Sequence, residues 1–188
     1  TTHAGNDFPK QQQDFKFQFK GLVAFYDPPK KNISEVLSAF EKAGITVKII
    51  TGDNEATTRN IAAQIQFKDY DKSLGGEELV KLSDKELDEQ VMQVNIFTRM
   101  FPDAKLKVVE ALKRNNEVVA MTGDGVNDGP ALKAAHIGVA MGKKGTEIAK
   151  QASSMIITDD DMAKMVDAVA MGRRIYSNLK KAIQYIIS

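Results

Sequence analysis

The sequence predicts an α/β fold in which helices flank a doubly wound parallel sheet. Short apolar runs typical of buried strands alternate with stretches of helical periodicity, at residues 45–50, 96–99, 117–121, 137–141 and 155–158. Two of these runs lead into the tripeptide Thr-Gly-Asp, which begins at Thr51 and again at Thr122. Because an open parallel sheet binds its ligands at the carboxyl ends of its strands, both tripeptides fall where a site is expected.

The N-terminal region differs from the rest in pattern. Residues 1–14 are polar and have little to bury, so we expect them to be mobile. Phe15, Phe17 and Phe19 then alternate with polar residues, which predicts a strand over 15–25 with exposed phenylalanines. The dipeptide at 28–29 is Pro-Pro, which ends that strand and stiffens the crossing into the sheet.

Helical segments connect the predicted strands. Asn32 and Glu35 are spaced as a capping box, and Gly44 ends the helix that they begin. A last helix starts at the three aspartates 159–161 and extends toward the C-terminus. The other predicted helices lie at residues 54–66, 83–90, 103–114, 126–135 and 146–152.

Composition excludes several classes of function. The 188 residues carry 26 Lys and Arg against 25 Asp and Glu, and a net charge of +1 argues against a broad nucleic-acid-binding face. No cysteine is present, which excludes disulfides and thiolate-held zinc, and two histidines disfavour a histidine-built metal site. No apolar run approaches the roughly 20 residues that span a bilayer, so we expect a soluble chain.

Oxygen ligands for a metal ion and hydrogen-bond donors to phosphate follow the two strands that lead into Thr-Gly-Asp. The run Thr-Gly-Asp-Gly-Val-Asn-Asp-Gly-Pro-Ala-Leu at 122–132 supplies the carboxylates of Asp124 and Asp128 for Mg²⁺ and the amide of Asn127 for a phosphate oxygen. Thr51 and Gly52 add a hydroxyl and a backbone amide. Together these groups predict a magnesium-dependent phosphoryl site.

The same motifs resemble a known family. The stretches 51–54 and 122–132 look like two signature motifs of cation-transporting P-type ATPases, Asp-Pro-Pro at 27–29 resembles their hinge, and 138–142 resembles their Gly-Val-Ala-Met-Gly strand. The resemblance runs from about residue 19 to the C-terminus, and favours the calcium, sodium or proton pump branch. It implies a Rossmann-like fold of the haloacid dehalogenase type. It also implies that the phosphorylated aspartate lies upstream, because the Asp-Lys-Thr-Gly motif is absent here.

The resemblance assigns a role to each candidate residue. Asp124 would bind Mg²⁺, Thr51 and the Gly52 amide would hold the phosphoryl oxygens with Asn127 as a further donor, and Asp128 would hold the loop behind the metal. Lys105, spaced from Arg99 and Pro102 as in the family, would neutralise the phosphate in preference to Lys107. Arg99 and Asp53 would contact the nucleotide.

The resemblance also divides the chain and names its partners. Residues 1–26 would include the last strand of a nucleotide-binding domain, 27–171 a phosphorylation domain, and 172–188 a cytoplasmic stalk helix leading to the membrane. Mg²⁺ and ATP are the implied cofactor and substrate. The partners would be the nucleotide-binding, actuator and membrane domains of a pump on the cytosolic face of a membrane, with an inorganic cation carried by absent helices and no nucleic acid. The isolated chain should not turn over.

Several residues have a purely structural interpretation. Asp53 could cap a helix, Lys105 could be a solvated helix lysine, residues 159–161 suit a cap with a solvated face, and His136 suits a neutral, satisfied side chain. The glycines and lysines of 138–145 lack the spacing of a phosphate loop. Two departures from the family pattern are Lys30, where the hinge has arginine, and Gly129, where many relatives have alanine or serine.

Two other functions remain open from the sequence: a soluble phosphatase of the same superfamily, and a non-catalytic interaction module. The missing nucleophile strand raises a further question, because in this superfamily it lies between the strands ending at Thr51 and Thr122. We therefore expect those strands to pair directly, to accept the 15–25 segment, or to close with a second chain, since unpaired central backbone is costly.

Overall fold

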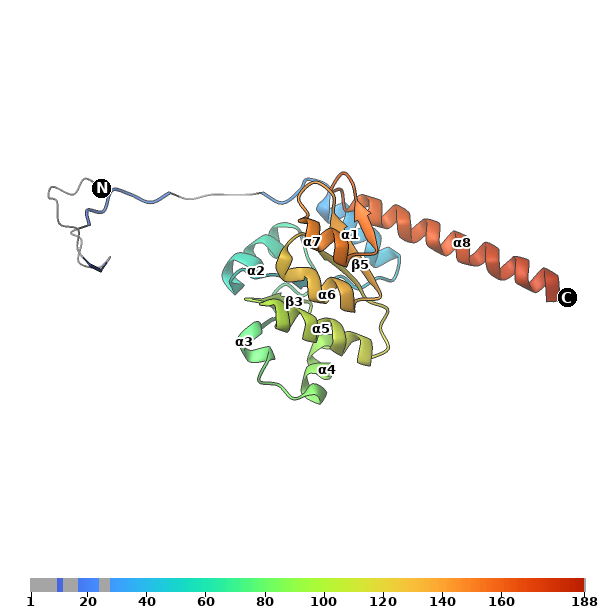
Figure 1. The fold of residues 1–188 in the computed structure, drawn as a ribbon, viewed down its shortest axis with the longest axis horizontal. Helices are drawn as coiled ribbons and strands as arrows, with labels where there is room; N and C mark the ends of the chain where they lie inside the picture. Colours follow the sequence, from blue (N-terminus) through green and yellow to red (C-terminus); the bar gives the residue numbers. More distant parts are fainter. Residues whose placement is uncertain (1–9, 12–16, 24–27, 188) are drawn as a thin grey trace.

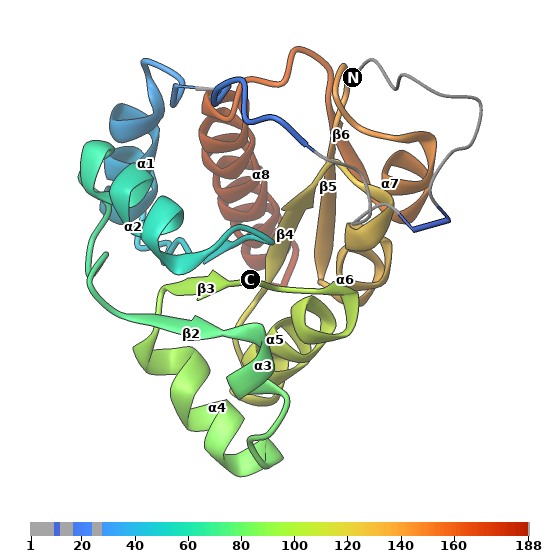
Figure 2. The same cartoon turned by 90° about the vertical axis from the view of Figure 1, so that its left-hand side faces the viewer.

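The chain folds into two separate three-stranded parallel sheets with helices packed around them (Figures 1 and 2). The computed structural model describes residues 10–11, 17–23 and 28–187. The first sheet has the order β1–β3–β2 and the second the order β4–β5–β6, with every pair parallel. The predicted α/β class is therefore confirmed.

The first sheet is built on a wholly buried central strand. β3 (Ile96–Thr98) pairs with β1 (Ile49–Ile50) and with β2 (Ser73–Gly75), and all three of its residues are buried. α2 (Glu55–Gln64) follows β1, and α3 (Gly76–Leu79) follows β2. α4 (Asp84–Gln93) begins with a full capping box between Ser83 and Glu86. β2 and α3 were not predicted, because that stretch is short and polar.

The second sheet also centres on its apolar strand. β5 (Ile137–Met141) lies between β4 (Ala120–Gly123) and β6 (Met155–Ile157). α6 (Gly129–Ala134) and α7 (Glu147–Ala152) cover it. A Cβ at Gly138 would lie 2.5 Å from the carbonyl oxygen of Leu132, so only glycine lets the end of α6 approach β5 this closely.

One helix joins the two sheets into a single core. α5 (Pro102–Arg114) packs against α4 on one side and against α6 on the other. Its inner face carries Val108 and Val109, both almost completely buried. The main cluster continues through both sheets, from Phe97 on β3 to Met121 on β4 and Ala140 on β5. The strands can therefore belong to one hydrophobic core without belonging to one sheet.

The inner edges of the two sheets do not pair with each other. Among the described residues β1 pairs only with β3, and β4 only with β5. In Figure 2 the strands of the two sheets run in different directions. The expectation that these edges would pair directly is therefore wrong, because packing through α5 holds them together without a shared ladder.

The described residues 17–23 of the N-terminal segment do not pair with the inner edge of either sheet. Residues 17–23 are exposed and form no strand, with Phe17 60% and Phe19 81% exposed. The exposed phenylalanines are confirmed at these two positions, but the strand is wrong there. Phe15 and Phe25, His3 and most of the segment predicted to be mobile lie outside the described residues.

The beginning and the end of the folded body lie side by side. α1 (Ile33–Lys42) packs against α8 (Ala163–Ile187), which then projects from the molecule (Figure 1). Asn32 precedes α1 without capping it, so the predicted capping box is wrong; its side chain instead donates to Asp161 Oδ1 at 3.1 Å. The Lys30 ammonium donates to the carbonyl oxygen of Asp160. Gly44 follows α1 with a φ of +70°, as the predicted stop requires.

Candidate functional site

The loop after β4 is held from inside by one buried carboxylate. Asp128, at 6% exposure, accepts hydrogen bonds on Oδ2 from the backbone amides of Asp124 at 3.3 Å and Gly125 at 3.1 Å. Its other oxygen, Oδ1, lies 2.6 Å from the Lys105 ammonium. Both side chains are largely enclosed, so the pair is weakly screened by solvent. The predicted loop-holding position of Asp128 matches this geometry.

Gly123 is required by the same arrangement. A Cβ on Gly123 would stand 2.5 Å from the Cβ of Asp128, a distance that no real pair of such atoms occupies. β4 extends to Gly123, two residues further than the predicted strand, because the backbone stays extended until the loop turns over Asp128. The helix predicted at 126–135, which follows this loop, divides into a 3₁₀ turn at Val126–Asp128 and α6.

The outer surface of this loop presents the remaining predicted groups. Asp124 and Asn127 are exposed, and the carbonyl oxygen of Asp124 accepts from the amide of Thr146 at 2.8 Å. Thr146 is the N-cap of α7, so the loop is also attached to the next helix of the second sheet. Lys105, Asp124 and Asp128 are therefore brought together by α5, β4 and α7.

The loop after β1 is held by the backbone instead. The amide of Arg99 donates to the carbonyl of Asp53 at 2.8 Å, and the amide of Met100 to that of Thr51 at 2.9 Å. Thr51 Oγ1 accepts from the Asp53 amide at 3.1 Å. Arg99 adopts a φ of +49°, which the two backbone bonds beside it maintain. The helix cap is Asn54, whose Oδ1 accepts from the Thr57 amide, so the capping interpretation of Asp53 is wrong.

A hollow of about 490 Å³ opens beside the loop after β1. It is lined by Arg99 and by two carboxylates, Glu55 and Glu78, together with Asn54, Ala56, Ser73, Gly75 and Thr98. Carboxylates accept from hydroxyls and repel phosphate, so the lining suits the hydroxyl groups of a sugar better than a polyphosphate.

The predicted residues thus form two groups. Thr51, Gly52, Asp53 and Arg99 stand at the end of the first sheet, and Lys105, Asp124, Asn127 and Asp128 at the end of the second. No hydrogen bond or ion pair between described residues links the groups. Within the described ranges no cluster of three or more His, Asp or Glu side chains could hold a metal ion. The exposed Asp124 carboxylate is a hard oxygen donor of the kind that Mg²⁺ prefers.

One structural carboxylate was missed from the sequence. Asp160 is buried, has a φ of +58°, and accepts from the backbone amides of Lys143 at 2.9 Å and Lys144 at 3.0 Å. The hydrogen bond from the Lys143 amide is the main reason that the pKa of Asp160 lies below its ordinary value, and the bond from the Lys144 amide adds to it. Burial of the carboxylate acts in the opposite direction and only partly offsets these two bonds. The backbone amides of Lys143 and Lys144, in the stretch 138–145 that was compared with a phosphate loop, are therefore occupied by a carboxylate. The interpretation of Asp160 as part of a solvated face is wrong, because its side chain is buried.

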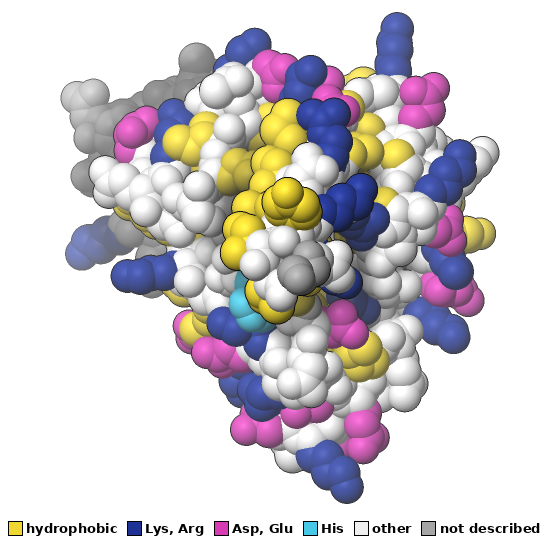
Figure 3. All heavy atoms as spheres, turned by 90° about the vertical axis from the view of Figure 1, so that its right-hand side faces the viewer, with side chains coloured by type: hydrophobic (Ala, Val, Ile, Leu, Met, Phe, Trp, Pro, Cys, Tyr) yellow, Lys and Arg dark blue, Asp and Glu magenta, His cyan; other side chains and the backbone are white. Residues whose placement is uncertain are grey.

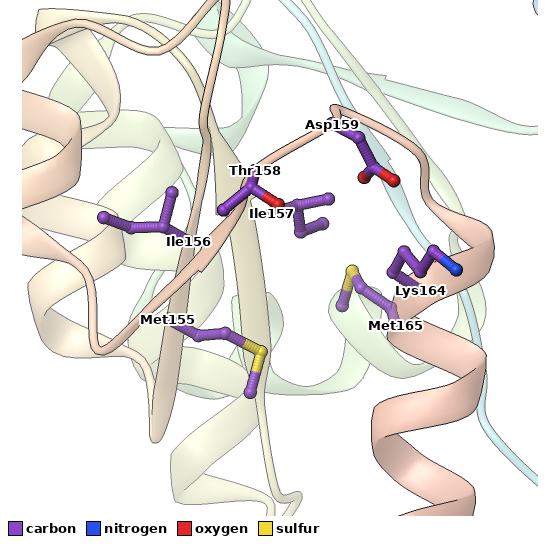
Figure 4. Close-up of a pocket in the computed structure, with 7 residues that line it drawn as sticks. All are labelled: Met155, Ile156, Ile157, Thr158, Asp159, Lys164 and Met165. Carbon is purple, nitrogen blue, oxygen red and sulfur yellow. The ribbon is translucent and has the colours of Figure 1, made fainter.

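The remaining sequence interpretations concern His136 and α8. The Nδ1 atom of His136 accepts from the Val119 amide at 3.1 Å, as expected of a satisfied side chain. A hollow of about 280 Å³ lies between β6 and the start of α8, where Met155 and Met165 face each other (Figure 4). None of the predicted site residues lines it. No helix among the described residues has the length and apolar character needed to cross a bilayer.

Comparison with known proteins decides the family. The pattern of haloacid dehalogenase-like hydrolases matches residues 5–136. The chain belongs to this family. Its fold is also that of solved P-type ATPases: a zinc-transporting PIB-type ATPase in the E2·Pi state superposes with a TM-score of 0.64 at 25% identity, over 82% of this chain and 21% of that one.

Calcium-transporting ATPases are among the relatives that the chain resembles in sequence. Calcium-transporting ATPase 1 of Lactococcus lactis is 45% identical over 169 residues, or 89% of this chain. The human calcium-transporting ATPase type 2C member 1 is 40% identical over 90% of the chain. This haloacid dehalogenase-like chain spans 19% of the length of each relative, about a fifth.

Proposed function

We propose that the chain is the C-terminal part of the phosphorylation domain of an ATP-driven, calcium-pump-like cation transporter. The observation that carries this proposal is the Lys105–Asp128 pair at 2.6 Å beneath the loop that ends β4. Asp128 fixes the backbone of Asp124 and Gly125, and the exposed Asp124 carboxylate is thereby held at the carboxyl end of a parallel strand. The similarity to calcium-transporting ATPases supports the same conclusion.

In this proposal the chain binds and orients a phosphoryl group. An ammonium group has three donors, so Lys105 can keep Asp128 and still donate to a phosphate oxygen. Thr51 Oγ1, the Gly52 amide and Asn127 would donate to the other oxygens. Mg²⁺ bound at Asp124 would supply charge neutralisation.

The nucleophile would be an aspartate on another segment of the full-length protein. Its carboxylate oxygen attacks the γ-phosphorus of ATP, the bond to the β,γ-bridging oxygen breaks, and ADP leaves. The hollow beside Arg99, with Asp53 at its loop, is where we place the sugar of the nucleotide. The cation, and the membrane domain that carries it, would also belong to the full-length protein.

Phosphorylation with ATP labelled at the γ-phosphate tests the proposal. The full-length protein in membranes should take up acid-stable, hydroxylamine-labile label in the presence of Mg²⁺, and this chain should take up none. Lys105→Gln in the full-length protein should lower labelling by about 100-fold, because it removes a donor to the developing charge. Lys107→Gln, two positions along the same helix, is the matched control.

Label on this chain itself would contradict the proposal, since another carboxylate would then be the nucleophile and Asp124 could not be assigned to the metal. Hydrolysis of a soluble phosphomonoester by the isolated chain would favour the phosphatase alternative.

A further inference from the structure

The turn between β6 and α8 carries a buried carboxylate that the proposed chemistry does not use. Figure 4 shows Thr158 and Asp159 leading out of β6 toward α8, and Asp160 is the next residue. The acidic side chains on the face drawn in Figure 3 stand at the surface beside Lys and Arg side chains, where solvent screens their charge. Asp160 is only 6% exposed, so its charge must be balanced by groups of the protein itself.

Asp160 is held in one position. Its backbone amide donates to the carbonyl of Ile157 at 3.2 Å, and its own carbonyl oxygen accepts from the Lys30 ammonium. Its φ of +58° lies in the left-handed region, which aspartate adopts more readily than most residues. Backbone contacts on both sides therefore fix the point from which the carboxylate reaches its partners.

The carboxylate binds the segment that follows β5. Oδ1 accepts from the Lys143 amide at 2.9 Å and Oδ2 from the Lys144 amide at 3.0 Å, so both oxygens bond to neighbouring residues of one turn. The side chains of the two lysines are exposed, so the segment is held through its backbone. A Cβ on Gly145 would overlap the carbonyl oxygen of Met141, which leaves this turn little room to change shape.

The same segment ends on the backbone of Asp124. The amide of Thr146, two residues beyond Lys144, donates to the carbonyl of Asp124 at 2.8 Å. The amide of Asp124 is bonded to Asp128 on the other side, so two separate contacts orient the residue whose exposed carboxylate we assign to Mg²⁺. One of these contacts depends on where the 142–146 segment lies, and Asp160 fixes that segment.

We infer that Asp160 is a positioning residue for the metal site: it holds the 142–146 segment, and through Thr146 it orients the loop of Asp124. The inference rests on the proposed function for the role of Asp124, but the linkage itself does not depend on phosphoryl transfer. Groups that hold a metal ligand in place change metal affinity about 10- to 100-fold when they are removed. Asp160 acts through a longer path, so a shift of about 5-fold is expected.

Two substitutions separate the carboxylate from the backbone that carries it. Asp160→Gly removes both acceptor oxygens, yet glycine suits a φ of +58°. Asp160→Asn keeps one acceptor oxygen and therefore one of the two bonds. Asp167→Asn is the matched control, because it removes one negative charge from an exposed position near the start of α8.

Amide hydrogen exchange in this chain measures the linkage without metal or nucleotide. Protection of the Thr146 amide should fall about 10-fold in Asp160→Gly and less in Asp160→Asn, while protection of the β5 amides changes little. Asp167→Asn should exchange as the unchanged chain does. Unchanged protection at Thr146, or an equal loss throughout β5, would overturn the inference, since the carboxylate would then not orient the loop.

The magnesium dependence of phosphorylation measures the consequence in the full-length protein. The Mg²⁺ concentration for half-maximal labelling should rise about 5-fold in Asp160→Gly, less in Asp160→Asn and not at all in the control, with little change in the ATP concentration required. A lower maximum of label at an unchanged Mg²⁺ requirement would overturn the inference, because Asp160 would then act on folding and not on the metal. Absence of labelling in the unchanged protein would contradict the proposed function instead, and exchange at Thr146 would still decide whether Asp160 holds the loop.

Discussion

The two Thr-Gly-Asp loops have the same sequence and the same place at a strand end, yet they are held in different ways. The loop after β1 is fixed by backbone bonds from Arg99 and Met100, whereas the loop after β4 is fixed by the Asp128 carboxylate and its Lys105 partner. Hydrogen bonds between backbone groups persist when most side chains are replaced. The bonds made by the Asp128 carboxylate are lost when that one side chain is replaced. The second loop should therefore be far more sensitive to single changes than the first.

The largest difference is expected between the two aspartates. Asp128→Ala leaves the enclosed Lys105 ammonium unpaired and two loop amides without their acceptor, and should lower the free energy of unfolding by about 3 kcal/mol. Asp53→Ala removes an exposed carboxylate and should cost less than about 0.5 kcal/mol. Urea unfolding of both variants measures the difference. Equal losses would mean that the loops are held alike.

The two glycines of these loops give a similar contrast with a smaller effect. Gly123→Ala forces the new methyl group against the Asp128 side chain and should cost about 2 kcal/mol through the displaced loop. Gly52→Ala meets only the Met100 carbonyl oxygen at 3.8 Å, an ordinary contact, so its cost should stay below about 0.5 kcal/mol. Thermal melting of the two variants side by side decides this, and a stable Gly123→Ala protein would show that Asp128 can move.

Helix caps should show no contrast. Asn54 caps α2, which follows a strand of the first sheet, and Thr146 caps α7, which precedes a strand of the second sheet. Each residue caps its helix through one side-chain oxygen. Replacing either by alanine should cost about 1 kcal/mol. Denaturant midpoints that differ widely between these variants would indicate that one unit unfolds before the other.

The pH dependence should separate the two sheets, although by the smallest amount. The pKa of Asp160, near the second sheet, is lowered by the amides of Lys143 and Lys144, so its stabilising effect is complete above the ordinary pKa and is lost below about pH 4.

Lys48, before β1, differs from Asp160 because folding disfavours its charged form. Burial lowers its pKa against the opposing charge of Glu117, so the unfolded chain binds more protons between the native and ordinary values and stability rises with pH in that alkaline window. Urea midpoints across pH should lose the acid slope in Asp160→Asn and the alkaline slope in Lys48→Met. Unchanged slopes would assign them to other groups.

The sequence predicted what depends on local pattern. The apolar runs located β3, β5 and β6 closely, and the Thr-Gly-Asp motifs located both loops. β2 was missed because Ser73–Gly75 is strand only through its pairing with β3. Asp160 was misread because its partners, the amides of Lys143 and Lys144, lie in a loop across β6 that no spacing in the sequence reveals.

The relation between the sheets was least accessible. The cost of unpaired backbone led to the prediction that β1 pairs directly with β4. The structure instead buries the apolar surfaces of both sheets in a core built around α5, without a hydrogen-bonded ladder between them. Burial is non-directional, so it joins elements whose backbone groups do not meet.

The contacts at the entrance to the domain have a mechanical consequence. Lys30 and Asn32 bind the segment that immediately precedes α8, so the chain leaves the folded body close to where it enters. A force applied between Pro28 and the far end of α8 would load these contacts before it reached either sheet. The entrance and the base of the projecting helix are thus tied to each other by direct contacts.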